Sequence, residues 1–535
     1  MKKINFFCRL AAVSTALILL SSCRSIDTAD IPVPASAASS SRTEAAAETA
    51  AGIILGGAGV TAVTAAPFPG NDISPADVTS VVTSDADTTS GASATTADAS
   101  AVSTTAAADD TAAETTTAAA SSVTAAVSTT TDTTTTTATS TTTTTTTTTT
   151  AAAVTEAPPI QSGSYAKNSY KALNHSYVKA VWISYIELSN HLAGKNEAGF
   201  RSEFGAMLDN CVGLGINTVY VHVRSHGDAY YYSSLFPFTK RLGGTLGTRA
   251  SFDPLSIMVS EAHARNISIH AWINPLRLGS DSDLAASAGY PVGKWYSGAE
   301  KGTYIVNVSG TWYLNPGYTA VRSLIADNVR EIVSDYDVDG VHIDDYFYPS
   351  TDAGFDSAAF SASGYSTLSS FRIGNINAMV RDMYTAAHEC GSAVFGAAPQ
   401  GNNSNNLNQL YADTKAWCAG GYIDYFAPQI YYGFKNSGVP FAGCVDEWAA
   451  IVKGTKTKLY AGLSVYKAGN EDKWAGTGKT EWQDNTDILA RQKEYADSSG
   501  CNGIALYSYS YLFDSGYRTS AMKAEIDNLK PLMTK

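Results

Sequence analysis

From Val178 onward the sequence alternates eight times between a short apolar run and an amphipathic stretch with helical spacing. The runs are rich in Val, Ile and Tyr, as expected for strands that helices connect into a parallel sheet. The expected strands are residues 178–185, 217–223, 267–275, 339–346, 393–399, 425–431, 458–465 and 503–510. Eight such units in about 350 residues predict an α/β fold, the (β/α)8 TIM barrel.

A doubly wound sheet is the main rival fold. Its Gly-rich phosphate loop should directly follow a strand, but the Gly-rich run at residues 56–59 lies far upstream of the repeats. The barrel is therefore favoured. The connection after the third strand is unusually long, and residues 303–314 within it predict an extra hairpin.

Residues 1–160 have a composition that cannot build an ordinary core. They contain neither Trp nor Tyr, and residues 141–150 are all Thr. They carry 5 basic and 14 acidic side chains, so most of the net charge of −13 belongs to them. We expect residues 23–160 to be a disordered Ala/Thr/Ser-rich tether and residues 161–535 to be the folded domain.

The first 22 residues are typical of an export signal. A basic start, Lys2 and Lys3, precedes an apolar stretch too short to span a bilayer. The stretch ends in Leu-Ser-Ser-Cys23, which resembles the bacterial lipobox, so Cys23 is the expected lipidation site. A lipid anchor would hold the protein on the extracytoplasmic side of the membrane, in the cell envelope; a plain secretory signal with a chance Cys is the alternative.

The remaining 375 residues are nearly neutral, which argues against a nucleic-acid partner because such proteins need a basic face. Five cysteines without CxxC spacing argue against a zinc knuckle or a disulfide framework. No metal or other cofactor is expected.

Polar side chains gather where the predicted strands end, which is where TIM barrels carry their active sites. Residues two apart on a strand share a face, so those at alternate positions should point together into the barrel mouth. The candidates are His222, Arg224 and Asp228 at strand two; His270, Trp272, Asn274 and Arg277 at strand three; His342 and Asp344 at strand four; Gln429 and Tyr431 at strand six; and Tyr507 and Tyr509 at strand eight.

The pair Asp344-Asp345 is the sharpest feature, because two adjacent carboxylates after a buried strand are costly unless they are paired or used. Their repulsion should keep one protonated as an acid while the other stays ionised. Arg224 could hold the ionised one. Strict alternation points Asp345 away from the mouth, so its direct role requires a bulge or turn at the strand end.

Glycoside hydrolysis needs a proton donor and generally a second carboxylate. Candidates for the second are Asp345, Glu187, Asp228, and Glu471 or Asp472. If the sugar carries an N-acetyl group, its carbonyl oxygen can be the nucleophile, and an Asp-Asp pair fits that scheme. Aromatic side chains at 230–232, 295–296 and 312–313 could stack on sugars or could pack the extra hairpin.

Residues 178–512 resemble the bacterial glycosyl-hydrolase-like (family-10-like) lipoproteins with a (β/α)8 barrel, some of which cleave peptidoglycan glycan strands stripped of stem peptides. The matching stretches are Ala-Val-Trp at 180–182, Asn-Thr-Val-Tyr at 217–220, Val-Arg at 223–224, Gly-Asp-Ala at 227–229, Phe-Asp-Pro-Leu at 252–255, His-Ala-Trp-Ile-Asn-Pro at 270–275, Leu-Asn-Pro at 314–316, Asp-Gly-Val-His-Ile-Asp-Asp-Tyr-Phe-Tyr-Pro at 339–349, Asp-Tyr at 424–425 and Pro-Gln-Ile-Tyr at 428–431.

The resemblance implies glycosidase activity on a polysaccharide in the envelope, with Asp344 as the leading catalytic carboxylate. It also implies that Arg224, His270, Asn274 and Gln429 line the cleft. This chain departs from that family in having His222 where Gln is common, and in the stretch at 397–400.

Two other function classes remain open from the sequence. A metal-dependent polysaccharide deacetylase is suggested by Asp344 and Asp345 together with His222 and His226, which lie four residues apart. A non-catalytic glycan-binding protein on a stalk is the other.

Overall fold

Eight parallel strands close into a barrel, which confirms the predicted fold. The computed structural model describes residues 165–534; the expected signal peptide, Cys23 and the tether lie outside the described residues. Around the barrel the order is β1-β2-β3-β6-β7-β8-β9-β10, and β10 pairs with β1. The strands are β1 (Val178–Ile183), β2 (Thr218–Arg224), β3 (Ser268–Ile273), β6 (Gly340–Ile343), β7 (Val394–Ala397), β8 (Tyr425–Phe426), β9 (Lys458–Ser464) and β10 (Gly503–Tyr507).

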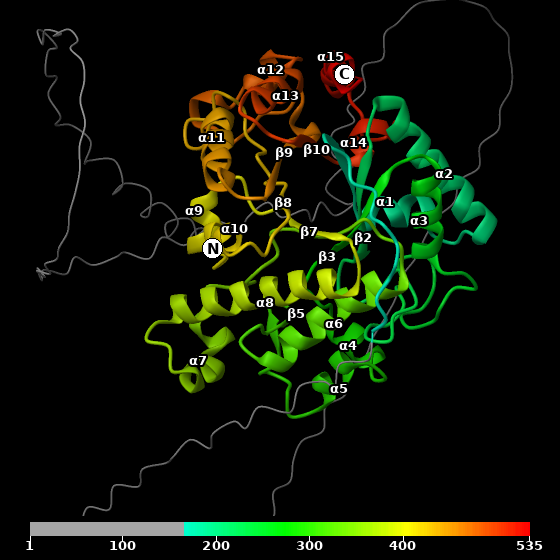
Figure 1. Cartoon of the computed structure of the whole chain (residues 1–535), viewed down its shortest axis with the longest axis vertical. Coiled ribbons are helices and arrows are strands. Elements are labelled where there is room, and N and C mark those ends of the chain that lie inside the picture. Colours follow the sequence, from blue (N-terminus) through cyan, green and yellow to red (C-terminus); the bar gives the residue numbers. More distant parts are fainter. Residues whose placement is uncertain (1–164, 535) are drawn as a thin grey trace, which may run out of the picture. The chain divides into compact units, whose positions relative to one another are not determined.

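Helices follow the strands and cover the outside of the barrel, where α6 and α8 lie side by side (Figure 1). The larger ones are α1 (Tyr185–Leu192), α2 (Glu197–Leu214), α3 (Pro254–Ala264), α6 (Thr319–Asp335), α8 (Leu368–Cys390), α11 (Phe441–Val452), α13 (Ile488–Ser498) and α15 (Ser520–Met533). Shorter ones are α4 (Asp281–Ala286), α5 (Pro291–Ser297), α7 (Ser357–Ser363), α9 (Asn403–Asn408), α10 (Thr414–Gly420), α12 (Glu481–Asp484) and α14 (Tyr509–Phe513). No helix among residues 165–534 has the length and apolarity that a membrane span requires.

Local sequence signals explain where helices begin. The Asp253 side chain accepts hydrogen bonds from the backbone N–H groups of Leu255 and Ser256, and Pro254 occupies the first turn of α3. The Phe-Asp-Pro-Leu stretch of the sequence is therefore a helix start. Asp253 also accepts a hydrogen bond from the Tyr336 hydroxyl at 2.5 Å, which ties α3 to the end of α6.

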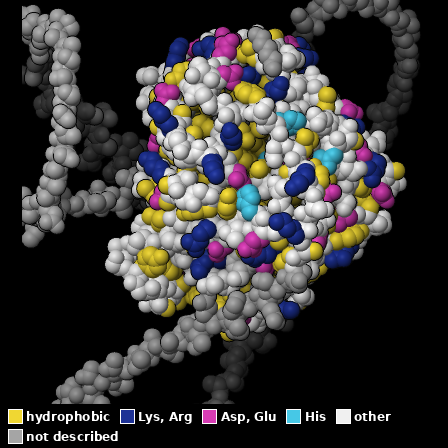
Figure 2. Space-filling model, viewed as in Figure 1, with side chains coloured by type: hydrophobic (Ala, Val, Ile, Leu, Met, Phe, Trp, Pro, Cys, Tyr) yellow, Lys and Arg dark blue, Asp and Glu magenta, His cyan; other side chains and the backbone are white. Residues whose placement is uncertain are grey.

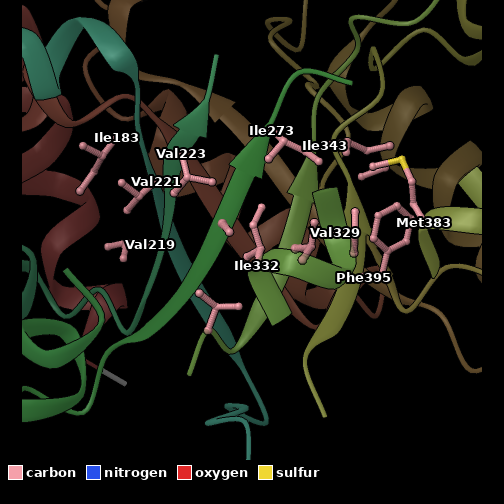
Figure 3. Packing of buried hydrophobic residues seen from close by; sticks show 14 of the residues in the cluster. Ile183, Val219, Val221, Val223, Ile273, Val329, Ile332, Ile343, Met383 and Phe395 are labelled. Atoms are coloured by element: carbon pink, nitrogen blue, oxygen red, sulfur yellow. The ribbon is translucent and has the colours of Figure 1, made fainter. Parts of the chain in front are cut away.

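Alternation along each strand separates two apolar layers. Outward residues such as Val219, Val221 and Val223 of β2 pack in the layer that includes Val329 and Ile332 of α6 (Figure 3). Residues at the intervening positions point into the barrel and fill it with aromatic rings; these are Trp182, Tyr220, Trp272, Tyr425, Tyr460 and Tyr507. The interior is thus a packed core.

β8 is much shorter than the run at 425–431 suggests. Pro428 has no backbone N–H to donate, so a regular ladder cannot continue through it. Beyond Phe426 only bridges remain, from Gln429 to Gln400 and to Gly462. The irregular segment nevertheless keeps Gln429 at the upper end of the barrel, where the strands present their carboxyl termini.

The long connection after β3 contains the predicted hairpin, made of β4 (Ile305–Val308) and antiparallel β5 (Thr311–Leu314). Its aromatic residues pack on each other: Trp295 lies edge-on to Tyr304 at 5.4 Å between ring centroids, and Trp312 is buried and donates to Asp281 at 3.1 Å. The insertion therefore uses much of its aromatic surface for its own packing.

The five cysteines of the described domain are all buried free thiols. On the face shown in Figure 2, basic and acidic side chains are interspersed and do not separate by sign.

Candidate active site

Asp344 and Asp345 follow β6 directly, at the end of the barrel where all eight strands present their carboxyl termini. The strand ends at Ile343, and the chain then bends at Asp345, where the Asp345 carbonyl accepts a hydrogen bond from Phe347 at 2.9 Å. This turn releases Asp345 from strand alternation. Both carboxyl groups can therefore serve the barrel mouth, as the sequence hypothesis required.

The Asp344 carboxyl group is 2 % exposed and is held by three donors. Its Oδ2 accepts from Asn274 Nδ2 at 2.6 Å and from Trp272 Nε1 at 3.1 Å, and its Oδ1 accepts from the backbone N–H of Tyr346 at 3.2 Å. Burial, together with the charge of Asp345, raises the pKa of Asp344 to about 7 despite these donors. Asp344 can therefore carry a proton at neutral pH, as a general acid must.

The Asp345 carboxyl group is held by two side-chain amides. Gln429 Nε2 donates to Oδ1 at 2.8 Å, and Gln400 Nε2 donates to Oδ2 at 3.3 Å. Burial raises the pKa of Asp345, and the hydrogen bonds from both Gln side chains oppose that rise because they favour the carboxylate. The two acids thus have different surroundings, and Asp345 is the one better suited to remain ionised.

Aromatic rings and one arginine lie around the pair. Burial raises the pKa of Tyr431, and the charges of Asp345 and Asp344 add to the rise; the Tyr431 ring meets Trp182 edge-on at 6.5 Å. The Arg277 guanidinium lies 5.4 Å from the ring centre of Tyr346 and 5.9 Å from that of Tyr185. Of the predicted sugar-contacting residues, the structure thus gathers Trp272, Asn274, Gln429 and Tyr431 close to the carboxyl pair.

Arg224 corrects the sequence hypothesis, because the structure does not pair it with an Asp of the site. The register of β2 shifts between His222 and Arg224, so Arg224 stands beside the outward residue Ile273. Its three hydrogen bonds go to Asn328 of α6, to the Pro275 carbonyl and to the His226 carbonyl. The guanidinium therefore fastens the barrel wall to α6.

His270 and His342 also lie elsewhere than expected, deep in the barrel and below the mouth. His342 accepts from Trp182 Nε1 at 3.0 Å, and both imidazoles bond the Tyr425 hydroxyl, at 2.9 Å from His342 and 2.7 Å from His270. Alternation predicts their inward direction correctly but says nothing about depth. They belong to the filled core beneath the site.

The other acids proposed from the sequence have structural partners. Glu187 completes the capping box of α1 and accepts from Ser508 Oγ at 2.5 Å. Asp228 accepts from Thr239 at 2.6 Å and lies 3.8 Å from Arg241, while burial raises its pKa. On the loop after β9, Asp472 pairs with Lys467 at 2.7 Å and Glu471 pairs with Lys479 at 3.2 Å.

The acids of the motif at residues 339–349, around β6, have two different roles. Its first acid, Asp339, is fully buried before the strand and accepts from the Tyr170 hydroxyl and from the backbone N–H of Ile269, both at 2.8 Å. Gly340 is required because a Cβ there would lie 2.5 Å from the His270 ring. Only the two acids at the far end belong to the mouth.

A metal centre as required by the deacetylase alternative finds little support in the side-chain arrangement. Across residues 165–534, His, Cys, Asp and Glu side chains form no group of three or more arranged to hold a metal ion. His222 bonds Asn274 at 2.7 Å, and His226 contacts the Ser225 hydroxyl at 3.0 Å and the Arg241 guanidinium at 3.1 Å. The two imidazoles thus have separate tasks.

Sequence reasoning missed Gln400 as a functional candidate. It follows β7, whose end carries no acid, and its amide reaches Asp345 only through the irregular chain around Pro399. The departure from the family pattern at 397–400 is the signal that could have singled it out.

A TIM barrel that holds two neighbouring carboxyl groups in different surroundings at its mouth is the arrangement found in glycoside hydrolases of the barrel class. The chain belongs to the family Glycosyl hydrolase-like 10, whose model matches residues 177–476.

Similar proteins include glycosyl hydrolase YngK of Bacillus subtilis, 31% identical over 322 residues, and glycosyl hydrolase DigH of Escherichia coli K12, 30% identical over 333 residues. These matches cover 55% and 57% of this chain, and 61% of YngK and 74% of DigH. The glycoside hydrolase domain of PgaB from Bordetella bronchiseptica aligns in structure with a TM-score of 0.41 at 11% identity, over 66% of this chain and 99% of that one.

Proposed function

We propose that this protein hydrolyses glycosidic bonds in peptidoglycan glycan strands that lack stem peptides, at the cell envelope. The observation that carries the proposal is the pair of carboxyl groups at the barrel mouth. Asp344 is buried and has a pKa raised to about 7, and the neighbouring Asp345 accepts hydrogen bonds from the Gln429 and Gln400 amides. This pairing of a protonated acid with an ionised one is the arrangement that glycoside cleavage uses.

Asp344 gives its proton to the glycosidic oxygen, so that the bond from that oxygen to the sugar C1 breaks with its electron pair leaving on the oxygen. Asp345, ionised and held by Gln429 and Gln400, stabilises the positive charge that develops on the sugar. Both peptidoglycan sugars carry N-acetyl groups, so the acetamide oxygen can bond to C1. Asp345 then orients the acetamide, and Asp344 takes a proton from the water that opens the intermediate.

The placement that we expect for the enzyme fits a cell-wall substrate. The expected lipid anchor at Cys23 would fix the chain to the outer side of the membrane, and a coil from 23 to 160 would reach several tens of Å into the wall. This localisation is part of the proposal.

Trp474 supports a polymeric glycan as the substrate. It is 78 % exposed and lies on the loop that leaves the upper end of β9, on the same end of the barrel as the carboxyl pair. A sugar ring can stack its apolar face on an indole at such a rim. We assign Trp474 to a subsite remote from the bond that is cleaved.

The substrate is tested by incubating the protein with peptidoglycan before and after an amidase has removed the stem peptides, with chitin as a third substrate. Release of soluble reducing fragments from the denuded strands alone is the expected result. Cleavage of intact peptidoglycan at the same rate would contradict the specificity. Binding to all three without any product would support a glycan-binding protein instead.

A further inference from the structure

His222 contacts both side chains that hold Asp344 Oδ2, and it is the register partner of Trp272 on the neighbouring strand. It is 3 % exposed at the inner face of β2, and its ring stacks on Trp272 with 3.3 Å between ring centroids and 16° between planes. Its Nε2 is 2.7 Å from Asn274 Oδ1. One imidazole thus supports Trp272 by stacking and Asn274 by a hydrogen bond.

The directions of the hydrogen bonds that run from Tyr185 through His222 to Asn274 follow from the first donor, the Tyr185 backbone N–H. The backbone N–H of Tyr185 lies 3.1 Å from His222 Nδ1 and can only donate, so Nδ1 must accept. A neutral imidazole then carries its proton on Nε2, which donates to Asn274 Oδ1. The Asn274 amide is consequently fixed with its NH2 group toward Asp344.

These hydrogen-bond directions also determine which Asp344 oxygen carries the proton. Oδ2 accepts from both Asn274 and Trp272, which uses both of its lone pairs. Oδ1 accepts only from the Tyr346 N–H among these donors. The proton of the neutral acid therefore resides on Oδ1.

We propose that His222 is a positioning residue that orients Asn274 and Trp272, and through them presents the acidic proton of Asp344 on Oδ1. The role rests on the proposed function of Asp344 as the acid. His222 is also the residue at which this sequence departs from the family pattern in β2, so the positioning role explains that departure.

Burial, helped by nearby positive charges, keeps His222 in the required neutral form. Burial lowers the pKa of His222 well below its usual range, and the positive charges of Arg277, on the loop after β3, and Arg241, on the loop after β2, act in the same direction. Asp345 and the Tyr431 hydroxyl are titratable groups that interact with Asp344 itself. His222 therefore stays neutral across the pH range in which the acid titrates.

The experiment compares His222→Phe with His222→Gln. Phe keeps a ring to stack on Trp272 but frees the Asn274 amide to turn its oxygen toward Asp344, which favours the protonated acid and raises its pKa. We expect kcat to fall by about 10–100-fold, KM to change little, and the alkaline limb of the pH profile to move to higher pH. Gln offers one acceptor and one donor, so it should restore kcat and return the alkaline limb of the pH profile to its wild-type position.

Two further measurements make the outcome independent of turnover and of one variant. The carboxyl stretch of Asp344, isolated by difference infrared spectroscopy against Asp344→Asn, should titrate at higher pH in His222→Phe. Asn274→Leu removes the next donor toward Asp344, so it must also move the alkaline limb of the pH profile to higher pH. This variant tests the inference even if His222→Phe does not fold. His270→Phe is the matched control, a buried imidazole that should leave the Asp344 titration unmoved.

The results separate this inference from the proposed function. A folded His222→Phe variant with the wild-type pH limb and the wild-type carboxyl titration would overturn the positioning role. If the wild-type protein cleaves no glycan yet the carboxyl titration shifts as described, the positioning stands and the proposed function fails.

Discussion

Asp344→Asn is expected to make the protein more stable above pH 7 while it removes hydrolysis. The folded protein keeps the Asp344 proton up to about pH 7, whereas an unfolded chain releases it near the ordinary value of 3.8. Stability therefore declines as pH rises through this window, and the full penalty is present above pH 7. Asn cannot ionise and escapes the penalty.

The size of the effect follows from the pKa difference. About three pKa units at 1.36 kcal/mol each give about 4 kcal/mol between pH 4 and pH 8. For a folded part of roughly 370 residues, with an unfolding entropy of about 0.8 kcal/mol/K, this corresponds to about 5 °C in Tm. The difference in Tm between variant and wild type should grow by that amount over this range.

Differential scanning calorimetry of both proteins at several pH values measures this difference. Asp472→Asn is a matched control, because it removes a buried carboxylate that pairs with Lys467 at 2.7 Å and should lower Tm at neutral and alkaline pH alike. If the Asp344→Asn curve stays parallel to the wild-type curve from pH 4 to pH 8, the inference that Asp344 is a buried protonated acid is refuted.

Three further changes separate chemistry, scaffold and substrate binding. Gln429→Leu removes the 2.8 Å donor to Asp345 and should lower kcat by about 10-fold or more, with the acidic limb of the pH profile moved to higher pH; steady-state kinetics across pH would show it. Arg224→Leu breaks three hydrogen bonds in the wall and should cost about 3–5 kcal/mol of stability in urea titrations, while the folded fraction retains its kcat. Trp474→Ala should raise KM for long glycan strands several-fold and leave kcat on short oligosaccharides unchanged; an equal loss on both would argue against a remote subsite.

Much of the architecture could be predicted because alternation and repetition are local properties of the sequence. Each of the eight expected strands overlaps an observed one, and the insertion hairpin was found within residues 303–314. Asp344 and Asp345 stood out because adjacent acids after an apolar run are costly in any barrel. The strand lengths were less predictable, as the early end of β8 before Pro428 shows.

The site residues that sequence reasoning misplaced or missed depend on geometry that the strand pattern does not contain. Arg224 left the expected face through a register shift that nothing in its neighbours announces. His270 faces inward as expected but lies near the bottom of the barrel, because strand parity carries no information about height. The contacts of Gln400 and His222 depend on where distant segments come to rest, so they required the structure.

The role proposed for Asp344 is that of the acid of a glycoside hydrolase. The most direct measurement is the release of reducing ends from denuded peptidoglycan strands by the wild-type protein and by Asp344→Asn, at matched concentrations of folded protein. Release by the wild type is expected, with a loss of at least about 100-fold in the variant. Equal release by the two proteins would contradict it.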